Sequence, residues 1–290
     1  MDVLNPSPAL CLPQAMWLTY RTIMSNSDLS EEEVLALVTP NAMRASTPGL
    51  GAHAIRALRG LREFGLVQQD SDELYNAETV EGAPEFIRRL RRQLVVPSET
   101  LENGAQGAPD LRQGLVWLMR QSPAIPLNWE YVQAHNSVRL FTNDTRWNAF
   151  ADWPKALGLG RSALTAMATG LGLRETGVKI VPNPTEAVVD AIRHPFGERL
   201  PVGEEIPVQQ LLAFLRDELP VLPGHPSAVY DGIGNDPDNG LRALGLALSS
   251  AEERKVLSLS YQSDPSGVMA LPDAQDHGRD RYVSAVRILG

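Results

Sequence analysis

Residues 28–76 carry the clearest pattern of hydrophobic and polar positions in the chain, and this pattern predicts two helices followed by two short strands. Ser30 is a favoured N-cap residue, and Glu33 follows three positions later, which together form a capping box. The apolar face of the helix that begins there consists of Val34, Leu35, Leu37 and Val38. Pro40 ends this helix, because proline disrupts the hydrogen-bond ladder of a helix interior.

The next segment predicts a second amphipathic helix. Thr47 and Pro48 offer an N-cap and a first-turn proline, and Gly65 offers the C′ glycine that commonly ends a helix. With about 100° of rotation per residue, a single apolar arc is formed by Ala54, Ala57, Leu58, Leu61 and Phe64. The opposite, basic arc consists of Arg56 and Arg59, with Arg62 near its edge.

Two short apolar runs follow this helix, Leu66-Val67 and Leu74-Tyr75, with a polar tip at 68–73 between them. Helix, glycine, strand, polar turn and strand is the order of a winged helix. In DNA-binding helix–turn–helix proteins the second helix enters the major groove. We therefore expect Arg56, Arg59 and Arg62 to face double-stranded DNA. The alternative is an ordinary solvated helix face.

A further helix begins at Pro84 and is the most basic stretch of the chain. Its apolar stripe consists of Phe86, Ile87, Leu90 and Leu94. Its cations are Arg88, Arg89, Arg91 and Arg92. We predict that these arginines contact the DNA backbone. A solvated face and an acidic protein partner are the alternatives.

Residues 97–110 are rich in glycine, proline and polar residues, which predicts a linker. A second copy of the opening pattern follows, with a helix over 161–173, strands around 173–181, and a helix capped by 183–186 and running to Ile192. The few cations near this copy are Arg161, Arg174 and Lys179. The pattern predicts a packing module more than a DNA reader.

A third, fainter copy has an amphipathic helix over 208–219, a strand over 256–261, a turn, and a return strand over 268–271. A last strand over 281–289 closes the chain. The fold that we expect is mainly α with short β-wings, arranged as tandem winged helix–turn–helix modules. The predicted modules are 1–98, 108–200 and 201–290.

The composition is that of a globular protein of 290 residues, with a net charge of −9 and a pI near 5.1. The acidic total argues against non-specific coating of nucleic acid, since such binding depends on many phosphate contacts by lysine and arginine. Cys11 is the single cysteine, which fits a reducing compartment. Without a signal-peptide pattern or an apolar run of about 18 residues, we expect a cytoplasmic protein that does not enter membranes.

No motif for catalysis is visible. The phosphate-loop pattern is absent, and Gly158-Leu159-Gly160 lacks the third glycine of a dinucleotide fingerprint. The loop at 230–240 resembles a calcium loop, but the twelfth position counted from Asp236 is Ala247, where a glutamate is needed. The five histidines stand apart without metal-ligand spacing. We therefore expect no catalytic residues, no metal and no cofactor, and we expect that the protein is not an enzyme.

Four segments together resemble the DpdG proteins, which are accessory components encoded with bacterial systems that place 7-deazapurines in DNA and act in phage defence. These segments are LNPSP, RALRGLREFGLV, VPNPTEAV and SDPSG with RYVSAVRI. The resemblance implies a non-enzymatic subunit that acts on DNA or within a protein complex, with other subunits of a modification or defence system as partners. It supplies no catalytic residue.

The expected function is DNA binding or complex assembly in a DNA-modification or phage-defence system. One alternative is a protein–protein interaction scaffold without direct DNA binding, which the acidic total and the neutral second copy favour. Another is a winged-helix transcription regulator, which would normally dimerise on a palindromic site.

Overall fold

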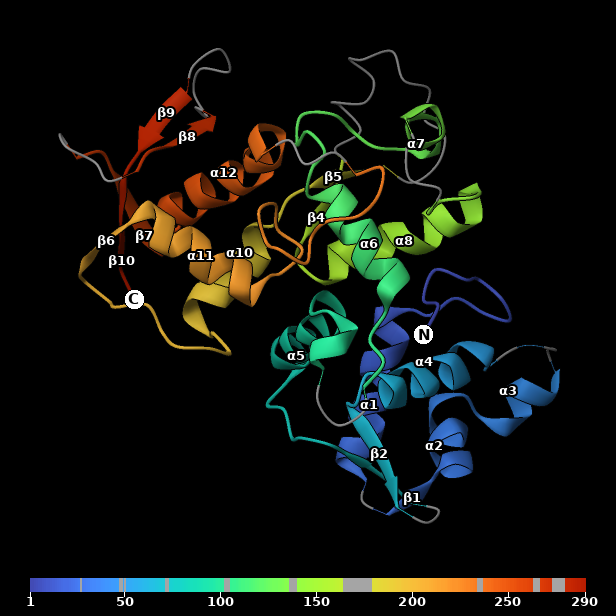
Figure 1. Ribbon diagram of the computed structural model, residues 1–290. Coiled ribbons are helices and arrows are strands. Elements are labelled where there is room, and N and C mark those ends of the chain that lie inside the picture. The colour runs from blue at the N-terminus through green and yellow to red at the C-terminus, as the bar shows by residue number, and fades with distance from the viewer. Residues whose placement is uncertain are drawn as a thin grey trace. The chain divides into compact units, whose positions relative to one another are not determined.

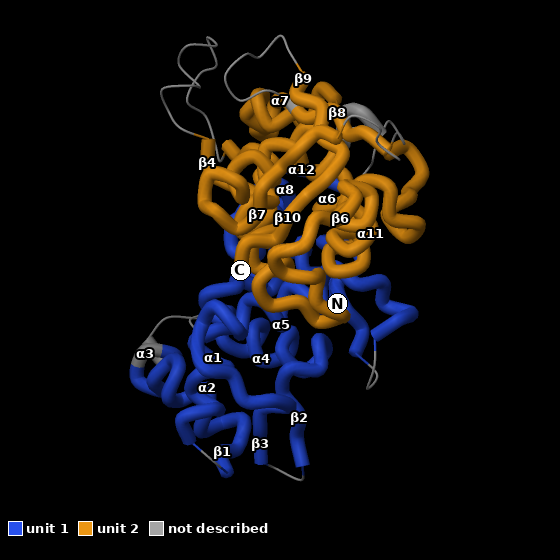
Figure 2. The backbone as a smooth tube through the Cα atoms, turned by 90° about the vertical axis from the view of Figure 1, so that its left-hand side faces the viewer, with its two compact units in different colours: residues 1–112, 140–157 blue, residues 113–139, 158–290 orange. Residues whose placement is uncertain are grey.

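The chain folds into two compact units, which are coloured separately in Figure 2. One unit comprises residues 1–112 and 140–157, and the other comprises residues 113–139 and 158–290. Helices account for about half of the chain and the sheets are small and antiparallel, so the expectation of a mainly helical fold with short β-elements is confirmed. The computed structural model describes residues 1–26, 28–46, 49, 51–70, 73–101, 105–135, 140–163, 179–233, 237–262, 267–272 and 280–290.

The first unit is built around α1 and α4, which pack against each other (Figure 1). Its helices are α1 (Pro13–Ser25), α2 (Glu31–Val38), α3 (Asn41–Ser46), α4 (Ala52–Glu63), α5 (Ala83–Val95), the 3-10 helix η1 (Ser98–Thr100) and α8 (Asp144–Ala156). Its strands are β1 (Leu29–Ser30), β2 (Val67–Asp70) and β3 (Glu73–Asn76). The boundary between the units falls within α6 (Pro109–Leu118).

The predicted strand pair within 66–76 is present as β2 and β3. Val67 lies opposite Asn76, and Asp70 lies opposite Glu73, in antiparallel register. The two-residue strand β1 pairs with the other edge of β3, so the sheet order is β1-β3-β2. The first strand in the chain therefore lies next to the third, and the third next to the second.

The second unit repeats this order in its C-terminal part. The sheet β6-β10-β7 again places the last strand between the two earlier ones, with helices between β6 and β7. The helices of this unit are α7 (Trp129–His135), α10 (Thr185–Arg193), α11 (Val208–Glu218) and α12 (Pro237–Glu253). Its strands are β4 (Gly160–Ser162), β5 (Ile180–Pro182), β6 (Glu205–Pro207), β7 (Leu257–Ser260), β8 (Met269–Pro272), β9 (Asp280–Val283) and β10 (Ala285–Ile288).

The strand pair predicted over 256–271 is wrong. β7 pairs with β10, and β8 pairs with β9. The segment 281–289, expected as one strand, contains both β9 and β10, which are separated at the buried Ser284. The hydroxyl of Ser284 accepts a hydrogen bond of 2.8 Å from the backbone N–H of Gln262. The turn residues after β7 predicted a hairpin between β7 and the next strand. Instead β7 pairs with β10, and the alternating apolar side chains of β7 are buried there.

The second copy also differs from its prediction. Arg161 and Ser162, expected at the start of a helix, lie in β4, which pairs with β5. Residues 164–173 of the predicted helix and most of the predicted strands lie outside the described residues, as does Arg174. Ile180 of β5 also exchanges backbone hydrogen bonds of 2.8 and 3.0 Å with Leu127. Residues 180–182 therefore form a strand because they pair with segments that are distant in the sequence. The helix expected after 183–186 is α10, which begins one residue later than predicted, at Thr185.

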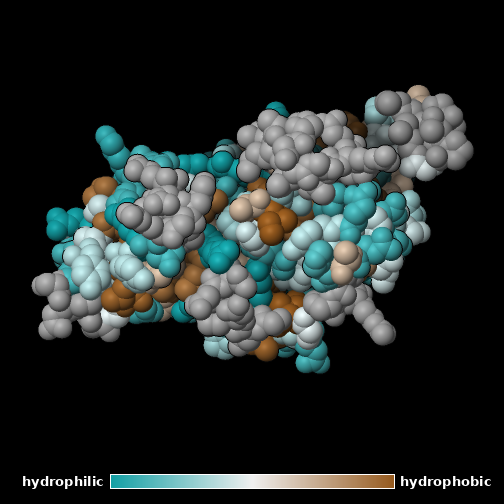
Figure 3. Space-filling view, turned by 90° about the horizontal axis from the view of Figure 1, so that it is seen from above, coloured by the Kyte–Doolittle hydropathy of each residue, from teal (hydrophilic) through white to brown (hydrophobic). Residues whose placement is uncertain are grey.

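Each unit buries a core of large apolar side chains. In the first unit Trp17 and Tyr20 of α1 pack against Phe86 of α5 with tilted rings, whose centroids lie 5.2 and 4.9 Å from that of Phe86. On the face in Figure 3, the described hydrophobic residues reach the surface in small patches separated by hydrophilic residues. Within the described ranges, no helix combines the length and apolar character needed to cross a membrane.

Candidate nucleic-acid interface

Helix α4 has a defined end that sets the position of the hairpin after it. Gly65 has a φ of +71°. Its N–H donates to the carbonyl of Arg62 at 3.0 Å, and the N–H of Leu66 donates to the carbonyl of Leu61 at 2.9 Å. These are the two hydrogen bonds of a Schellman motif, so the C′ role predicted for Gly65 is confirmed. The predicted start at Thr47-Pro48 lies outside the described residues, and α4 begins at Ala52.

The preceding helix also follows its sequence signals. Ser30 accepts a hydrogen bond from the N–H of Glu33, and the carboxylate of Glu33 accepts one of 2.9 Å from the N–H of Ser30. The capping box is therefore confirmed.

The apolar arc predicted for α4 is the face that packs into the core. All of its members, Ala54, Ala57, Leu58, Leu61 and Phe64, are buried. On other faces of the helix, the Arg59 side chain is 68% exposed and the Arg62 side chain is 44% exposed. These two arginines therefore lie at a surface that a polyanion can reach.

Both exposed arginines lie beside carboxylates. Arg59 Nε is 2.7 Å from Glu63 Oε1, and Arg62 Nη1 is 3.3 Å from Glu31 Oε2. Burial raises the pKa of Glu63, but hydrogen bonds, including that from Arg59, outweigh burial and hold the pKa below its usual value. The Arg62–Glu31 pair is exposed on both sides, and such pairs are worth about 0–1 kcal/mol. Glu63 is partly buried and also pairs with the N-terminal ammonium at 3.2 Å, but the guanidinium of Arg59 remains largely exposed, so a phosphate group can approach either arginine.

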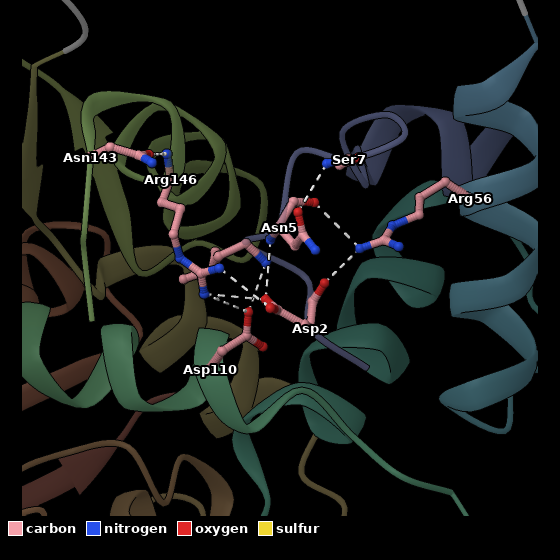
Figure 4. A network of polar contacts seen from close by, with 8 residues as sticks. Asp2, Asn5, Ser7, Arg56, Asp110, Asn143 and Arg146 are labelled. Atoms are coloured by element: carbon pink, nitrogen blue, oxygen red, sulfur yellow. Dashed lines mark hydrogen bonds and ion pairs between the residues drawn. The ribbon is translucent and has the colours of Figure 1, made fainter. Parts of the chain in front are cut away.

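Arg56 has a different environment from Arg59 and Arg62. Its side chain reaches the main chain of the N-terminal segment, where Nη2 donates to the carbonyls of Asp2 at 2.6 Å and Asn5 at 3.3 Å (Figure 4). Arg56 therefore holds the N-terminal segment against α4 and lies outside the candidate interface.

The N-terminal segment is held from two further elements. Arg146 at the start of α8 contacts the carboxylate of Asp2 at 3.2 Å, and Asp110 at the start of α6 accepts a hydrogen bond of 2.7 Å from the N–H of Leu4 (Figure 4). Burial, with a hydrogen bond to Asp2, raises the pKa of Asp110 to about 6. Burial also acts to raise the pKa of Asp2, but hydrogen bonds with Asp110 and Arg146 outweigh it and lower the pKa.

The arginines of α5 do not form a single exposed cluster. Arg91 is 6% exposed and donates to the carbonyl of Leu157 at 3.2 Å. Arg89 pairs with Glu85 at 2.8 Å and with Glu78, and its side chain is 26% exposed. The remaining two, Arg88 and Arg92, are half-buried and engaged in interactions of their own. Arg91 therefore lies on the core side of α5, away from the candidate interface. Its hydrogen bond follows the general rule that a buried arginine is paired.

Carboxylates lie beside the arginines of α4 and at the end of the hairpin that follows it. Glu31 and Glu63 pair with its arginines, and Asp70 lies directly opposite Glu73 at the end of the hairpin. Both hairpin carboxylates are exposed. The local field is therefore mixed in sign rather than purely positive.

A second group of cations lies in the other unit. Arg161 of β4 and Arg254 after α12 both contact the carboxylate of Glu186, at 2.9 and 2.8 Å. Sequence reasoning noted Arg161 but missed Arg254, because 93 residue positions separate them and no local signal connects them. Across the described ranges, no group of three or more His, Cys, Asp or Glu side chains is arranged to hold a metal ion.

These features define a mainly helical protein with small antiparallel sheets, in which one strand order occurs in both units and arginines are exposed on the helix before a hairpin. A family model described as DpdG-like matches residues 1–265, and the chain belongs to the DpdG-like family. This membership associates the chain with a DNA-modification system. Comparison with curated proteins gave no match, and comparison with solved structures gave none.

Proposed function

We propose that this chain is a non-enzymatic winged-helix subunit of a bacterial DNA-modification or phage-defence system, which contacts double-stranded DNA through α4 and assembles with the other subunits. The family membership supports the association with DNA modification. The observation that carries the DNA contact is the exposure of Arg59 and Arg62 on the helix that precedes the β2–β3 hairpin.

The winged-helix assignment rests on chain order and sheet order. In the first unit α1, β1, α2, α4, β2 and β3 follow one another, and β3 lies between β1 and β2. In the second unit α10, β6, α11, α12, β7 and β10 follow the same order, and β10 lies between β6 and β7. Between these, β5 pairs with β4 and also bridges to Leu127. We take these as three winged-helix modules. The divisions predicted from the sequence were 1–98, 108–200 and 201–290, and the third module now begins earlier, because it includes α10.

The first and third modules differ in how much of their last helix is exposed. α4 presents Arg59 and Arg62 to solvent, whereas the side chains of α12 are buried or half-buried from Ala243 to Glu252, between the exposed Arg242 and Glu253. A helix enters the major groove only with an exposed face. The first module is therefore the one that we assign to DNA contact, with Arg88, Arg89 and Arg92 of α5 as further candidates.

The test is the salt dependence of binding between the full chain and a fluorescent DNA duplex. If Arg59 and Arg62 contact phosphates, the double variant Arg59→Ala/Arg62→Ala should lower the slope of log affinity against log salt by about one unit per arginine. The matched control Arg21→Ala/Lys155→Ala removes the same charge from α1 and α8 of the same unit. Equal slopes in the two variants, with circular dichroism confirming folding, would remove α4 from the interface.

A protein–protein scaffold is the second candidate function, and the carboxylates around α4 favour it. Glu31, Glu63, Asp70 and Glu73 lie on or beside the same helix and hairpin, and such a surface suits a basic protein partner. Absence of duplex binding at low salt, together with loss of a co-purifying subunit in Glu31→Gln/Glu73→Gln, would favour the scaffold. The transcription-regulator alternative has no observation in its favour.

A further inference from the structure

Two arginines from distant parts of the chain converge on one carboxylate in the second unit. Glu186, in the first turn of α10, accepts from Arg161 Nη2 at 2.9 Å and from Arg254 Nη2 at 2.8 Å. Arg254 Nη1 also lies 3.0 Å from the other carboxylate oxygen of Glu186, so this pair is bidentate. The hydrogen bonds from Arg254, followed by those from Arg161, outweigh burial and lower the pKa of Glu186, which stays ionised at neutral pH.

Lys179 lies on the same hairpin face as Arg161. Arg161 is directly opposite Val181 in the β4–β5 register, and the N–H of Ala163 donates to the carbonyl of Lys179 at 3.2 Å. Side chains alternate along a strand, so residues 179 and 181 share a face. Diagonal neighbours on such a face lie within reach of long side chains.

The cluster keeps an excess of positive charge. One carboxylate cannot neutralise two guanidiniums, and each guanidinium carries five N–H donors in a planar fork. Lys255 follows Arg254 and is exposed. Glu186 is the carboxylate that both guanidiniums contact, so the group of Arg161, Glu186 and Arg254 keeps a net positive charge within a chain whose total charge is −9.

The cluster is also accessible to solvent. The side chains of Arg161, Glu186 and Arg254 are 50%, 54% and 38% exposed. Ion pairs at this exposure contribute little to stability, so a purely structural role explains the arrangement poorly. A phosphate offers oxygens that match the guanidinium fork in the way a carboxylate does.

We propose that Arg161, Lys179 and Arg254 form a second phosphate-contact surface for the nucleic-acid backbone, with Glu186 orienting both guanidiniums in the free protein. A bound phosphate would take guanidinium donors from Glu186 without any covalent step. This inference rests on the proposed function, because it assigns a second contact to the same nucleic-acid ligand.

The first test compares Arg161→Gln/Arg254→Gln with the control Arg193→Gln/Arg199→Gln, which removes two exposed cations of the same unit. The full-length chain is titrated with a fluorescent DNA duplex at several salt concentrations. We expect the slope of log affinity against log salt to fall by about one unit for each phosphate-binding cation that is removed, and to stay near the wild-type slope in the control. Equal behaviour of the two variants would overturn the proposal.

The second test removes the carboxylate. Glu186→Gln frees both guanidiniums for phosphate and should raise duplex affinity more than Glu198→Gln, which removes one exposed carboxylate from a loop of the same unit. If Glu186 and the two arginines only stabilise the fold, Glu186→Gln should lower the melting temperature without this gain in duplex affinity. If the double arginine variant does not fold, Lys179→Gln gives the same slope measurement with both arginine pairs to Glu186 intact.

The outcomes separate this inference from the function on which it rests. A salt slope lowered by Arg59→Ala/Arg62→Ala but unchanged by Arg161→Gln/Arg254→Gln would overturn the second surface alone. Failure of the wild-type chain to bind duplex at low salt would overturn both. Loss of a co-purifying acidic subunit in Arg161→Gln/Arg254→Gln, with duplex affinity unchanged, would assign the cluster to a protein partner and contradict the proposal.

Discussion

The Nη2 atom of Arg56 donates a hydrogen bond of 2.6 Å to the main-chain carbonyl of Asp2, 54 positions earlier in the chain. Its neighbours along this stripe of α4 face the same segment: His53 contacts the carbonyl of Leu10 at 3.0 Å, and a Cβ on Gly60 would lie 3.5 Å from Cys11 Sγ. One side of α4 therefore binds the N-terminal segment, while Arg59 and Arg62 remain at the surface. The two kinds of arginine should respond differently to mutation.

Arg56→Ala should destabilise the protein by about 1–3 kcal/mol, because it removes two hydrogen bonds from a charged donor that hold the N-terminal segment against α4. Arg59→Ala should change stability by about 0.5 kcal/mol or less, as exposed substitutions usually do. Urea unfolding followed by tryptophan fluorescence measures both. Equal free energies of unfolding for the two variants would show that Arg56 does not hold the segment.

Asp110 should make stability depend on pH. Its pKa in the folded state, about 6, lies above the ordinary value of 3.8. The folded protein therefore binds the proton more tightly, and the stability from this group is present at low pH and lost as the pH rises through about 6. Asp2 has a lowered pKa, so its contribution is lost only when the pH falls below about 3.8.

Asp110→Asn, which mimics the protonated group, should therefore gain stability relative to the wild type at pH 7.5 and lose that advantage at pH 4.5. Urea midpoints at both pH values provide the measurement. Asp152→Asn, at a partly exposed ion pair with Lys155 in the same unit, is the control. A difference between Asp110→Asn and wild type that does not vary with pH would contradict the assignment.

Glu218 should stabilise the loop after α10. It is 7% exposed and accepts hydrogen bonds from the N–H groups of Phe196 at 3.0 Å and Gly197 at 2.8 Å. Glu218→Gln turns one acceptor into a donor that faces an N–H, which should cost about 1–3 kcal/mol. Hydrogen exchange at residues 196 and 197 should accelerate, and exposed Glu253→Gln should leave it unchanged. Unchanged protection in Glu218→Gln would refute the role.

Gly158 should tolerate alanine less well than Gly203. Both have positive φ, +71° and +79°, which costs an L-residue about 1–2 kcal/mol. A Cβ at 158 would also lie 3.0 Å from the backbone nitrogen of Ala187, whereas a Cβ at 203 meets nothing within 4 Å. Thermal unfolding should show a larger loss for Gly158→Ala. Equal losses would mean that the contact with Ala187 relaxes freely.

The sequence by itself determined the local parts of this fold. The capping box of Ser30 and Glu33, the buried arc of α4 and the C′ glycine at 65 were predictable, because each depends on residues within one or two helical turns. The hairpin at 67–76 was predictable for the same reason, since a short polar tip between two apolar runs brings neighbouring strands together.

Tertiary structure decided which strands pair and which cations reach solvent. β7 alternates apolar and polar residues in a way that suits β8 or β10, and only packing in the second unit selects β10. Arg56 and Arg91 look like Arg59 and Arg92 in the sequence, yet carbonyls of Asp2 and Leu157 lie beside them in the fold. The grouping of Arg161 and Arg254 on Glu186 likewise follows from contacts between distant segments. Such contacts depend on where the chain returns in space, which helix and strand periodicity does not encode.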